Sequence, residues 1–394
     1  MKVWVIGRNY PLPGNGMQGS FELEQAKMLA RFGNDVQYLA CSLHPTKRIR
    51  RRGMLSWGED GLEVNVLSAF FVPRVFPLYL VKFRNSFWRK LFSAVESRHG
   101  LPEVIHVHYP AMLMIADALA EYRRRGVRII ATEHWTKVLH HRLDWIELRE
   151  YRKFSKLLDQ MLCVGSPLAK STSELIGREV KLLPNVVSEL FRPSTKRHPG
   201  FRFVAVGRLI ALKQFDRVVA AFAECFRGNA EVSLTIVGDG EERSRLQTMI
   251  QEGNLEAQVR LLGSQSRQQT AEIVSECDNL VCYSEYETFG VPIIEAWACG
   301  LTTTCTSTAA VVIDNFDDRL GVKVSPTDFD GLKSAMRFVY EHRDDYDREF
   351  IANFAFSHFS ETEIYRRLTE AYMSSSACDG AEAPHGIAST GLGN

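Results

Sequence analysis

Short apolar runs alternate with amphipathic segments along most of the chain. Runs typical of buried strands lie at residues 3–6, 36–40, 105–107, 127–131 and 161–164. Segments with apolar residues at helical spacing lie between them, at residues 20–32, 111–125 and 145–158. Strands that alternate with helices form a parallel sheet covered on both faces. The first half of the chain therefore predicts a doubly wound, Rossmann-like α/β domain.

A polar stretch at residues 191–200 interrupts this alternation, and its prolines and small polar residues are typical of a linker. The pattern then restarts. Strand-like runs lie at residues 202–206, 232–237, 259–262, 280–283, 302–305 and 322–324, and helical patterns at 214–226, 242–251 and 291–299. We expect two Rossmann-like domains, residues 1–190 and 201–360, whose sheets face a central cleft. A helix at residues 361–373 is expected to pack back on the first domain, and residues 374–394 to form a disordered tail.

Composition excludes several classes of protein. A length of 394 residues suits two domains, and a net charge of +1 argues against a dedicated nucleic-acid binder. The eight cysteines are scattered without a C-x-x-C pair, which favours buried thiols in a reducing compartment. The start of the chain reads as a strand and not as a signal peptide, and no run approaches the roughly 20 apolar residues of a spanning helix. These features predict a cytoplasmic protein.

Basic residues are concentrated in one region. Between His44 and Arg98 there are eleven lysines or arginines and four acidic residues. Residues 47–52 are mostly basic, and residues 72–98 mix apolar side chains with cations. This mixture suits an interfacial helix on anionic lipid, and it equally suits a core-packed helix with a solvated basic face. Peripheral binding to the inner face of the cytoplasmic membrane and core packing both stay open.

Two glutamates flank a predicted turn between a strand and a helix in the second domain. A buried strand ends at Tyr283, and the helix after the turn has Pro292 in its first turn. The free backbone amides expected at this turn belong to Phe289, Gly290 and Val291. Such amides and the positive end of the helix favour an anion. Glu287 and Glu295 stand on either side, and carboxylates accept hydrogen bonds from sugar hydroxyls. The segment predicts a site for a phosphate next to a sugar.

Two cations follow the first strand of the second domain. The strand ends at Gly207, and Arg208 and Lys213 lie five residues apart around the next turn. Cations in such a place can neutralise a diphosphate leaving group, as Mg²⁺ does in other transferases. The next strand ends at Gly238, which we assign to close backbone packing near a nucleotide.

The first domain contains a glycine-rich segment and a loop histidine. Gly14, Gly16 and Gly19 spell G-x-G-x-x-G, but seven residues separate them from the strand, so they are no dinucleotide fingerprint. His134 follows a strand at the edge expected to face the cleft. His106 and His108 lie on one face of a strand, and a zinc site would need a third ligand that is not evident, so we expect no metal.

These motifs resemble glycosyltransferase family 4, the retaining enzymes of the GT-B fold. The match rests on the two glutamates with Phe289-Gly290 between them, the run 295–300, and the Gly-Arg pair followed by Lys213. The resemblance implies that Glu287 contacts the donor sugar and Glu295 the nucleotide ribose. It also implies roles for further residues: Arg208 and Lys213 hold the leaving diphosphate, His134 contacts the transferred sugar, and Gly16 and Gly19 let the backbone approach the donor phosphates.

The resemblance implies a metal-independent hexosyltransferase without a cofactor. The donor is a nucleotide-diphosphate sugar, with UDP favoured over GDP. Residues 20–27 resemble members that build bacterial surface polysaccharides, which implies a glycan or polyisoprenyl-linked acceptor. The family's Pro and Gly-Gly pair are replaced by Leu301 and by Ala309 and Ala310, with Asp314 as the nearest acid. A nucleotide-sugar epimerase of the same fold and a non-catalytic donor-binding subunit are the alternatives.

Overall fold

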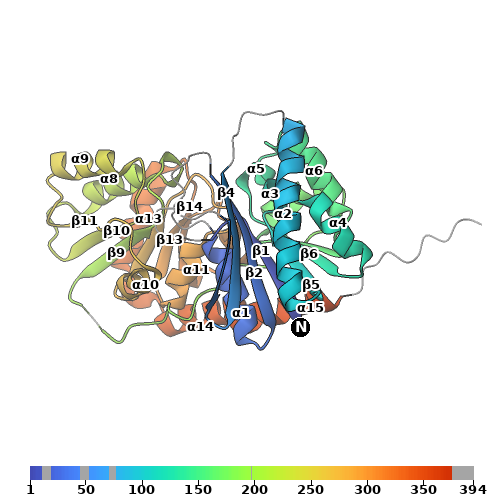
Figure 1. The fold of residues 1–394 in the computed structure, drawn as a ribbon. Helices are drawn as coiled ribbons and strands as arrows, with labels where there is room; N and C mark the ends of the chain where they lie inside the picture. Colours follow the sequence, from blue (N-terminus) through green and yellow to red (C-terminus); the bar gives the residue numbers. More distant parts are fainter. Residues whose placement is uncertain (11–18, 45–52, 71–76, 197, 375–394) are drawn as a thin grey trace, which may run out of the picture.

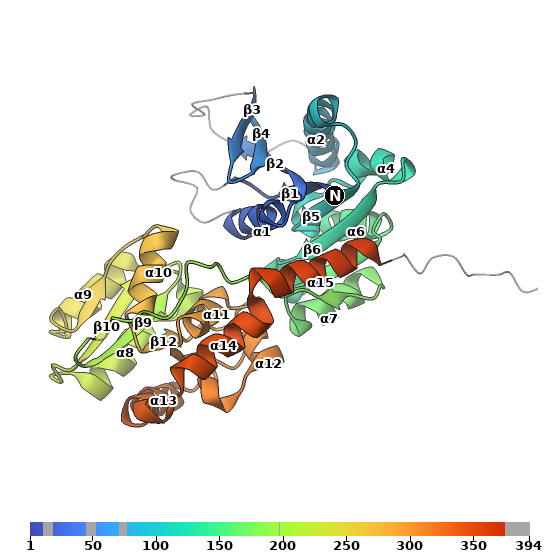
Figure 2. The ribbon, with the colours of Figure 1, turned by 90° about the horizontal axis from the view of Figure 1, so that it is seen from below.

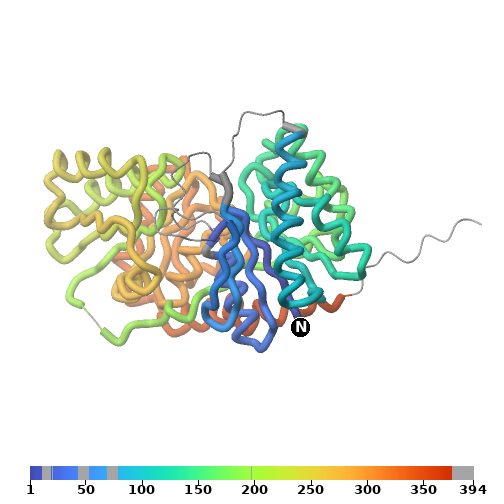
Figure 3. Tube along the Cα trace, viewed as in Figure 1, coloured from blue at the N-terminus to red at the C-terminus, as the bar shows by residue number. Residues whose placement is uncertain are grey.

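The computed structural model of the chain describes residues 1–10, 19–44, 53–70, 77–196 and 198–374. Two α/β domains lie side by side, and the C-terminal segment runs beneath both of them (Figures 1 and 3). This arrangement confirms the predicted fold class of two doubly wound domains. The exact boundaries at residues 190 and 200 stay a prediction.

The N-terminal sheet has eight strands in the order β3-β4-β2-β1-β5-β6-β7-β8. Their bounds are β1 Lys2–Gly7, β2 Asp35–His44, β3 Gly53–Glu59, β4 Leu62–Phe70, β5 Val104–His108, β6 Arg128–Glu133, β7 Gln160–Cys163 and β8 Lys181–Leu182. Strand β3 pairs antiparallel with β4, so the expectation of a wholly parallel sheet is wrong at this edge. The hairpin turns at Asp60 and Gly61, both with positive φ. An Asp-Gly pair between apolar runs is a hairpin signal, which the interpretation of the sequence missed.

The helices of this domain are α1 Ser20–Arg31, α2 Pro77–His99, α3 Pro110–Leu113, α4 Ala116–Arg124, α5 Thr136–Leu139, α6 Trp145–Ser155 and α7 Ser166–Ile176. The helix predicted at residues 111–125 is in fact two helices. Met114 adopts a left-handed conformation (φ 53°) between them, which the apolar periodicity across the break concealed. None of the described helices is long and apolar enough to cross a membrane.

The C-terminal sheet has six parallel strands in the order β11-β10-β9-β12-β13-β14. Its strands are β9 Phe201–Val206, β10 Val232–Val237, β11 Val259–Leu261, β12 Asn279–Cys282, β13 Thr302–Thr306 and β14 Gly321–Val324. Its helices are α8 Phe215–Phe226, α9 Arg243–Glu252, α10 Arg267–Ser275, α11 Val291–Ala298, α12 Ala310–Asn315, α13 Phe329–Glu341 and α14 Arg348–Phe359, with a short 3₁₀ turn η1 at Ala211–Lys213. The order reverses between β9 and β12, the place where such sheets bind ligands at their carboxyl ends.

Helix α15 (Glu361–Met373) follows the second domain in sequence and packs against the first (Figure 2). The ring of Tyr365 stacks on Phe32 at 4.2 Å between centroids. The hydroxyl of Tyr372 lies 2.9 Å from Nδ1 of the buried His106. These contacts join the end of the described chain to α1 and β5.

Candidate active site

Turns from two strands of the C-terminal domain meet through opposite charges. Lys213, at the end of η1 after β9, forms an ion pair with Glu287, which lies between β12 and α11. The hydroxyl of Ser284 donates to Oε1 of Glu287 at 2.7 Å. Burial acts to lower the pKa of Lys213, but the carboxylate of Glu287 outweighs it, and the net pKa is raised. Lys213 is therefore held as a cation, and its partner is held in a fixed position.

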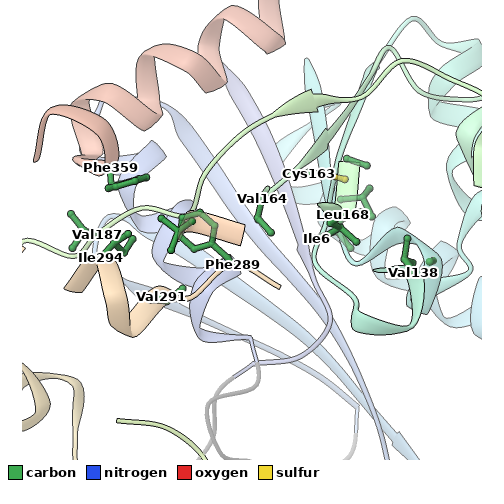
Figure 4. Close-up of a cluster of buried hydrophobic side chains, with 14 of the residues drawn as sticks. Ile6, Val138, Cys163, Val164, Leu168, Val187, Phe289, Val291, Ile294 and Phe359 are labelled. Carbon is green, nitrogen blue, oxygen red and sulfur yellow. The ribbon is translucent and has the colours of Figure 1, made fainter. Parts of the chain in front are cut away.

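The turn before α11 presents backbone amides. Gly290 caps the helix with a φ of 106°, a conformation that favours glycine. Among the described residues, the amides of Phe289, Gly290 and Val291 donate to no acceptor. The side chain of Phe289 is buried beside Val187, Ile294 and Phe359 (Figure 4). Phe289 and Val291 therefore have only backbone groups to offer a ligand, and these amides suit an anion.

Arg208 follows β9 directly and is exposed, without an ion pair to the described acids. Gly207 and Gly238, which directly follow β9 and the neighbouring β10, allow the two turns to approach each other. A Cβ added at Gly238 would lie 1.8 Å from the carbonyl oxygen of Gly207. Gly238 also has a φ of 143°, so a side chain would be strained as well as blocked. The expected close packing at Gly238 is present, whereas its closeness to a nucleotide stays a prediction.

Glu295 lies inside α11 and is buried, with only 3% of its surface exposed. Its Oε1 is 2.6 Å from a guanidinium nitrogen of Arg267, the first residue of α10. Burial raises the pKa of Glu295, and Arg267 acts against this rise. The sequence interpretation missed Arg267, which lies 28 positions before its partner and had no local signal.

His134 follows β6 at the carboxyl edge of the N-terminal sheet and is buried. Its Nε2 lies 3.0 Å from Nδ1 of His108, and its ring stacks on Tyr109. The carboxylate of Glu133 accepts the backbone amides of His134 and Trp135 at 2.9 Å, which holds the turn in shape. Burial lowers the pKa of His134 to about 3, so this imidazole is neutral at physiological pH.

The glycine-rich segment lies mostly outside the described residues, and Gly16 with it. Gly19 caps α1 with a φ of 90°, and a Cβ there would lie 2.2 Å from the carbonyl oxygen of Asn9. Next to it, Arg8 and the fully buried Glu22 form an ion pair of 3.1 Å, and Arg8 lies over the ring of Tyr109. This ion pair was not predicted, because only the burial of Glu22 makes it unusual.

Residues of both domains line a cavity between the sheets. The first domain contributes Glu24, Gln25, His108 and His134, and the second contributes Arg267. The cavity therefore lies between the expected acceptor side and the start of α10, where Arg267 is the ion-pair partner of Glu295. Among the described residues, no group of three His, Cys, Asp or Glu side chains could hold a metal ion.

Asp314 and Ala310, which lie in the segment that departs from the family pattern, contact the other domain. Asp314 accepts hydrogen bonds from the backbone amide of Ser166, at 2.8 Å, and from its hydroxyl. Ala310 packs on Gly165 so closely that a Cβ at Gly165 would lie 2.4 Å from its own. Ala309 caps α12 and bridges to the backbone of Glu287. Asp314 is thus engaged with the N-terminus of α7.

Helix α2 lies in the basic region, for which an interfacial helix and a core-packed helix were the alternatives. Its side chains of Trp88, Leu91 and Phe92 are at most 2% exposed and belong to the domain core. Lys82, Arg89 and Lys90 are exposed on the other face. The alternative of a core-packed helix with a solvated basic face is therefore correct for this part. Residues 47–52 and 71–76 lie outside the described ranges.

The chain matches two protein families along most of its length. The family described as "Glycosyltransferase Family 4" matches residues 19–189, and "Glycosyl transferases group 1" matches residues 186–354. The GPI3 subunit of phosphatidylinositol N-acetylglucosaminyltransferase from Saccharomyces cerevisiae is 24% identical over 265 residues, 63% of this chain. This chain spans only 57% of the length of that relative.

Two further proteins resemble the chain over more of its length. N-acetyl-alpha-D-glucosaminyl L-malate synthase from Bacillus anthracis is 25% identical over 76% of this chain and 78% of its own. The crystal structure of Anabaena HepE with UDP-glucose superposes with a TM-score of 0.67 at 15% identity, covering 94% of this chain and 99% of that one. The two matched families and the paired Rossmann-like domains lead to one conclusion: the chain belongs to glycosyltransferase family 4 and has the GT-B fold.

Proposed function

We propose that this glycosyltransferase transfers a hexose from a nucleotide-diphosphate sugar to a glycan or lipid-linked acceptor, with retention at the anomeric carbon and without a metal. One observation carries the proposal. Lys213, Glu287 and the free amides of residues 289–291 converge at the carboxyl ends of β9 and β12. Cationic and amide donors suit a diphosphate, and the carboxylate beside them suits the hydroxyls of the attached sugar.

The departing diphosphate explains why cations and free amides would be needed at this site. When the bond between C1 of the sugar and the diphosphate oxygen breaks, negative charge develops on that oxygen. Arg208, Lys213 and the amides of the α11 turn would stabilise it, because preorganised donors need no rearrangement during the reaction. The acceptor hydroxyl would attack C1 from the same face and pass its proton to the departing phosphate oxygen. Retention follows from attack on the face that the leaving group has just left.

The sugar would be held from both domains. Glu287 would accept hydrogen bonds from its hydroxyls, and His134 would contact it from the N-terminal side. A neutral imidazole can donate one hydrogen bond and accept another, which suits a sugar hydroxyl better than a proton transfer. Glu295 would accept hydrogen bonds from the ribose. Gly16 and Gly19 would let the backbone near α1 approach the donor phosphates.

The relatives favour a UDP-sugar, with a GDP-sugar as the second choice. The HepE structure contains UDP-glucose, and both curated relatives are named for N-acetylglucosaminyl transfer or synthesis. The name of the yeast relative includes a lipid acceptor, phosphatidylinositol. We infer a lipid-linked acceptor at the inner face of the bacterial cytoplasmic membrane, in the synthesis of a surface polysaccharide. The exposed cations of α2 support a location near anionic lipid.

The test is incubation with labelled UDP- and GDP-sugars and a polyisoprenyl-linked acceptor extract, followed by chromatography and by NMR of the new linkage. Transfer with an unchanged anomeric configuration, insensitive to EDTA, is the expected result. A donor converted to its epimer without acceptor labelling would identify an epimerase instead. Transfer that stops in EDTA and resumes with Mg²⁺ would overturn the metal-free mechanism.

A further inference from the structure

Arg267 is ion-paired with the carboxylate that the proposed function assigns to the ribose. Its Nη1 lies 2.6 Å from Oε1 of Glu295, and the Glu295 side chain is only 5% exposed. Among the described cations, Arg267 alone forms an ion pair with this carboxylate. A buried carboxylate without a partner would lose its charge, so Arg267 is needed for Glu295 to act as an anion.

The guanidinium group is fixed before any ligand binds. Its carbon lies 5.0 Å from the ring centroid of Phe191, which is fully buried at the start of the linker. The backbone of Arg267 is fixed as well, because Ser266 and Gln269 form a capping box at the N-terminus of α10. An arginine held by a ring and a capped helix loses little freedom when its partner is engaged.

Arg267 contacts only one of the two carboxylate oxygens of Glu295. Oε1 of Glu295 lies 2.6 Å from Nη1 of Arg267 in an ion pair that is not aligned as a hydrogen bond, and the described residues donate no hydrogen bond to Oε2. Arg267 also lines the cavity between the domains, and it forms an ion pair with Glu295, which is buried and does not itself line the cavity. The free oxygen has two lone pairs and can accept two hydroxyl hydrogens, as the vicinal hydroxyls of a ribose require.

We propose that Arg267 is the positioning residue for ribose recognition: by engaging Oε1 of Glu295 it leaves Oε2, as a carboxylate oxygen, directed at the hydroxyls. The inference rests on the proposed role of Glu295. It adds a residue outside the motif that carried that role, and it links the ribose site through Phe191 to the linker between the domains.

Removing Arg267 should make ribose recognition depend on pH. Besides Arg267, the charged group that acts on Glu295 is Glu24 of α1, and on its own helix the buried thiol of Cys299 lies near it, with Arg348 of α14 beside that thiol. Burial and Glu24 both raise the pKa of Glu295. Without Arg267 they act unopposed, so the carboxyl group would take up a proton at a higher pH and lose its acceptor strength.

The test compares the Kd of UDP with that of 2′,3′-dideoxy-UDP by calorimetry at several pH values. Their ratio isolates the hydroxyl contacts, because titration of the phosphates is common to both ligands. The proteins are wild type, Glu295→Gln, Arg267→Gln, Arg267→Lys, Phe191→Leu and the control Arg260→Gln, which changes an exposed residue of the neighbouring β11. If GDP binds more tightly than UDP, the comparison uses GDP and 2′,3′-dideoxy-GDP instead.

We expect the Kd of 2′,3′-dideoxy-UDP to exceed the Kd of UDP by about tenfold or more in the wild type and in Arg260→Gln. In Arg267→Gln the ratio should fall towards one at the lower pH values of the series and partly recover at the higher ones. Arg267→Lys should retain part of the ratio, and Phe191→Leu should give an intermediate value. A folding defect would lower the affinity for both ligands alike, so the ratio separates it from loss of positioning.

Two results would be decisive against the inference. If Arg267→Gln and Phe191→Leu keep the wild-type ratio while Glu295→Gln abolishes it, Glu295 recognises the ribose without help from Arg267, and the proposed function stands. If Glu295→Gln itself keeps the ratio, the ribose role of Glu295 fails and the role of Arg267 fails with it.

Discussion

Lys213 and Glu287, which are 74 positions apart in the sequence, form an ion pair at the carboxyl ends of β9 and β12. In the protein without substrate the two charges therefore satisfy each other. A donor that binds there must exchange this contact for one between Lys213 and a phosphate and one between Glu287 and a sugar. The two side chains act as a unit, so their contributions to catalysis should not be additive.

Replacement of Lys213 tests the leaving-group assignment. Lys213→Ala should lower kcat by a hundredfold or more, which corresponds to about 3 kcal/mol of transition-state stabilisation. Steady-state rates with and without EDTA check this, and EDTA should change nothing. The double variant with Glu287→Gln should lose less than the two single losses combined. As a control, Arg260→Ala removes an exposed cation outside the site and should retain full activity.

The two glutamates should separate in kinetics. Glu295 is expected to grip the ribose, which is common to donor and spent nucleotide, so Glu295→Gln should weaken nucleoside diphosphate binding. Glu287 is expected to grip the sugar, whose geometry changes in the transition state. Glu287→Gln should therefore cut turnover by about tenfold or more and leave nucleotide affinity nearly intact. Calorimetry beside steady-state rates measures both. Equal losses of nucleotide binding would show that the pair is one structural unit.

His106 should make the protein less stable in acid. Burial lowers its pKa to about 3, whereas the unfolded chain has a histidine pKa of about 6.5. As the pH falls below about 6.5, the unfolded state gains a proton that the folded state does not, so stability is lost towards pH 3. The loss for one such group is about 1.4 kcal/mol per pH unit.

His106→Asn should accordingly flatten the decline of unfolding free energy between pH 6.5 and 4, measured by chemical denaturation. Glu133 has the opposite effect on the unfolding free energy. Burial raises its pKa to about 7, so the folded state binds its proton more readily and gains stability as the pH falls. It is present in both proteins, so the difference between their slopes isolates His106. The loss of the contacts with Tyr372 and Thr132 shifts the whole curve without changing its slope. Identical slopes would mean that His106 is protonated in the folded protein.

Asp314 should couple the two domains. It caps the N-terminus of α7 from the other domain, so Asp314→Ala should remove about 1–2 kcal/mol and loosen the contact between domains. Small-angle scattering should show a larger radius of gyration. Asp347→Ala is the matched control, because Asp347 caps α14 within its own domain. The control should lower the melting temperature without changing the radius, and an equal radius in both variants would argue against the coupling.

The basic face of α2 gives a prediction about location. The protein should sediment with vesicles that contain anionic lipid and should be released by salt, because Trp88, Leu91 and Phe92 of α2 are buried in the core and Lys82, Arg89 and Lys90 are exposed. Changing Lys82, Arg89 and Lys90 together to Gln should reduce this binding severalfold. Equal sedimentation with neutral vesicles at all salt concentrations would contradict it.

Most strands and helices could be predicted because apolar period and turn chemistry act locally. The residues around Gly290 are the clearest case: a buried strand, a turn that requires a positive φ and a helix with Pro292 near its start predict a set of free amides. The same reasoning failed where the period hides a break, as at Met114, or where a strand lies at an edge, as in β3. Local pattern determines conformation well only where one conformation satisfies both the backbone and the burial of side chains.

The sequence by itself therefore determined two α/β domains, the turn at residues 287–290 and the chemical character of Lys213 and Glu287. Only the tertiary structure decided which charges meet. Arg267 reaches Glu295 because helices α10 and α11 pack side by side. Asp314 reaches Ser166 because the two domains pack against each other. The sequence does not distinguish an exposed carboxylate from a buried one. Their pKa values and ion-pair energies differ because packing creates low-dielectric surroundings.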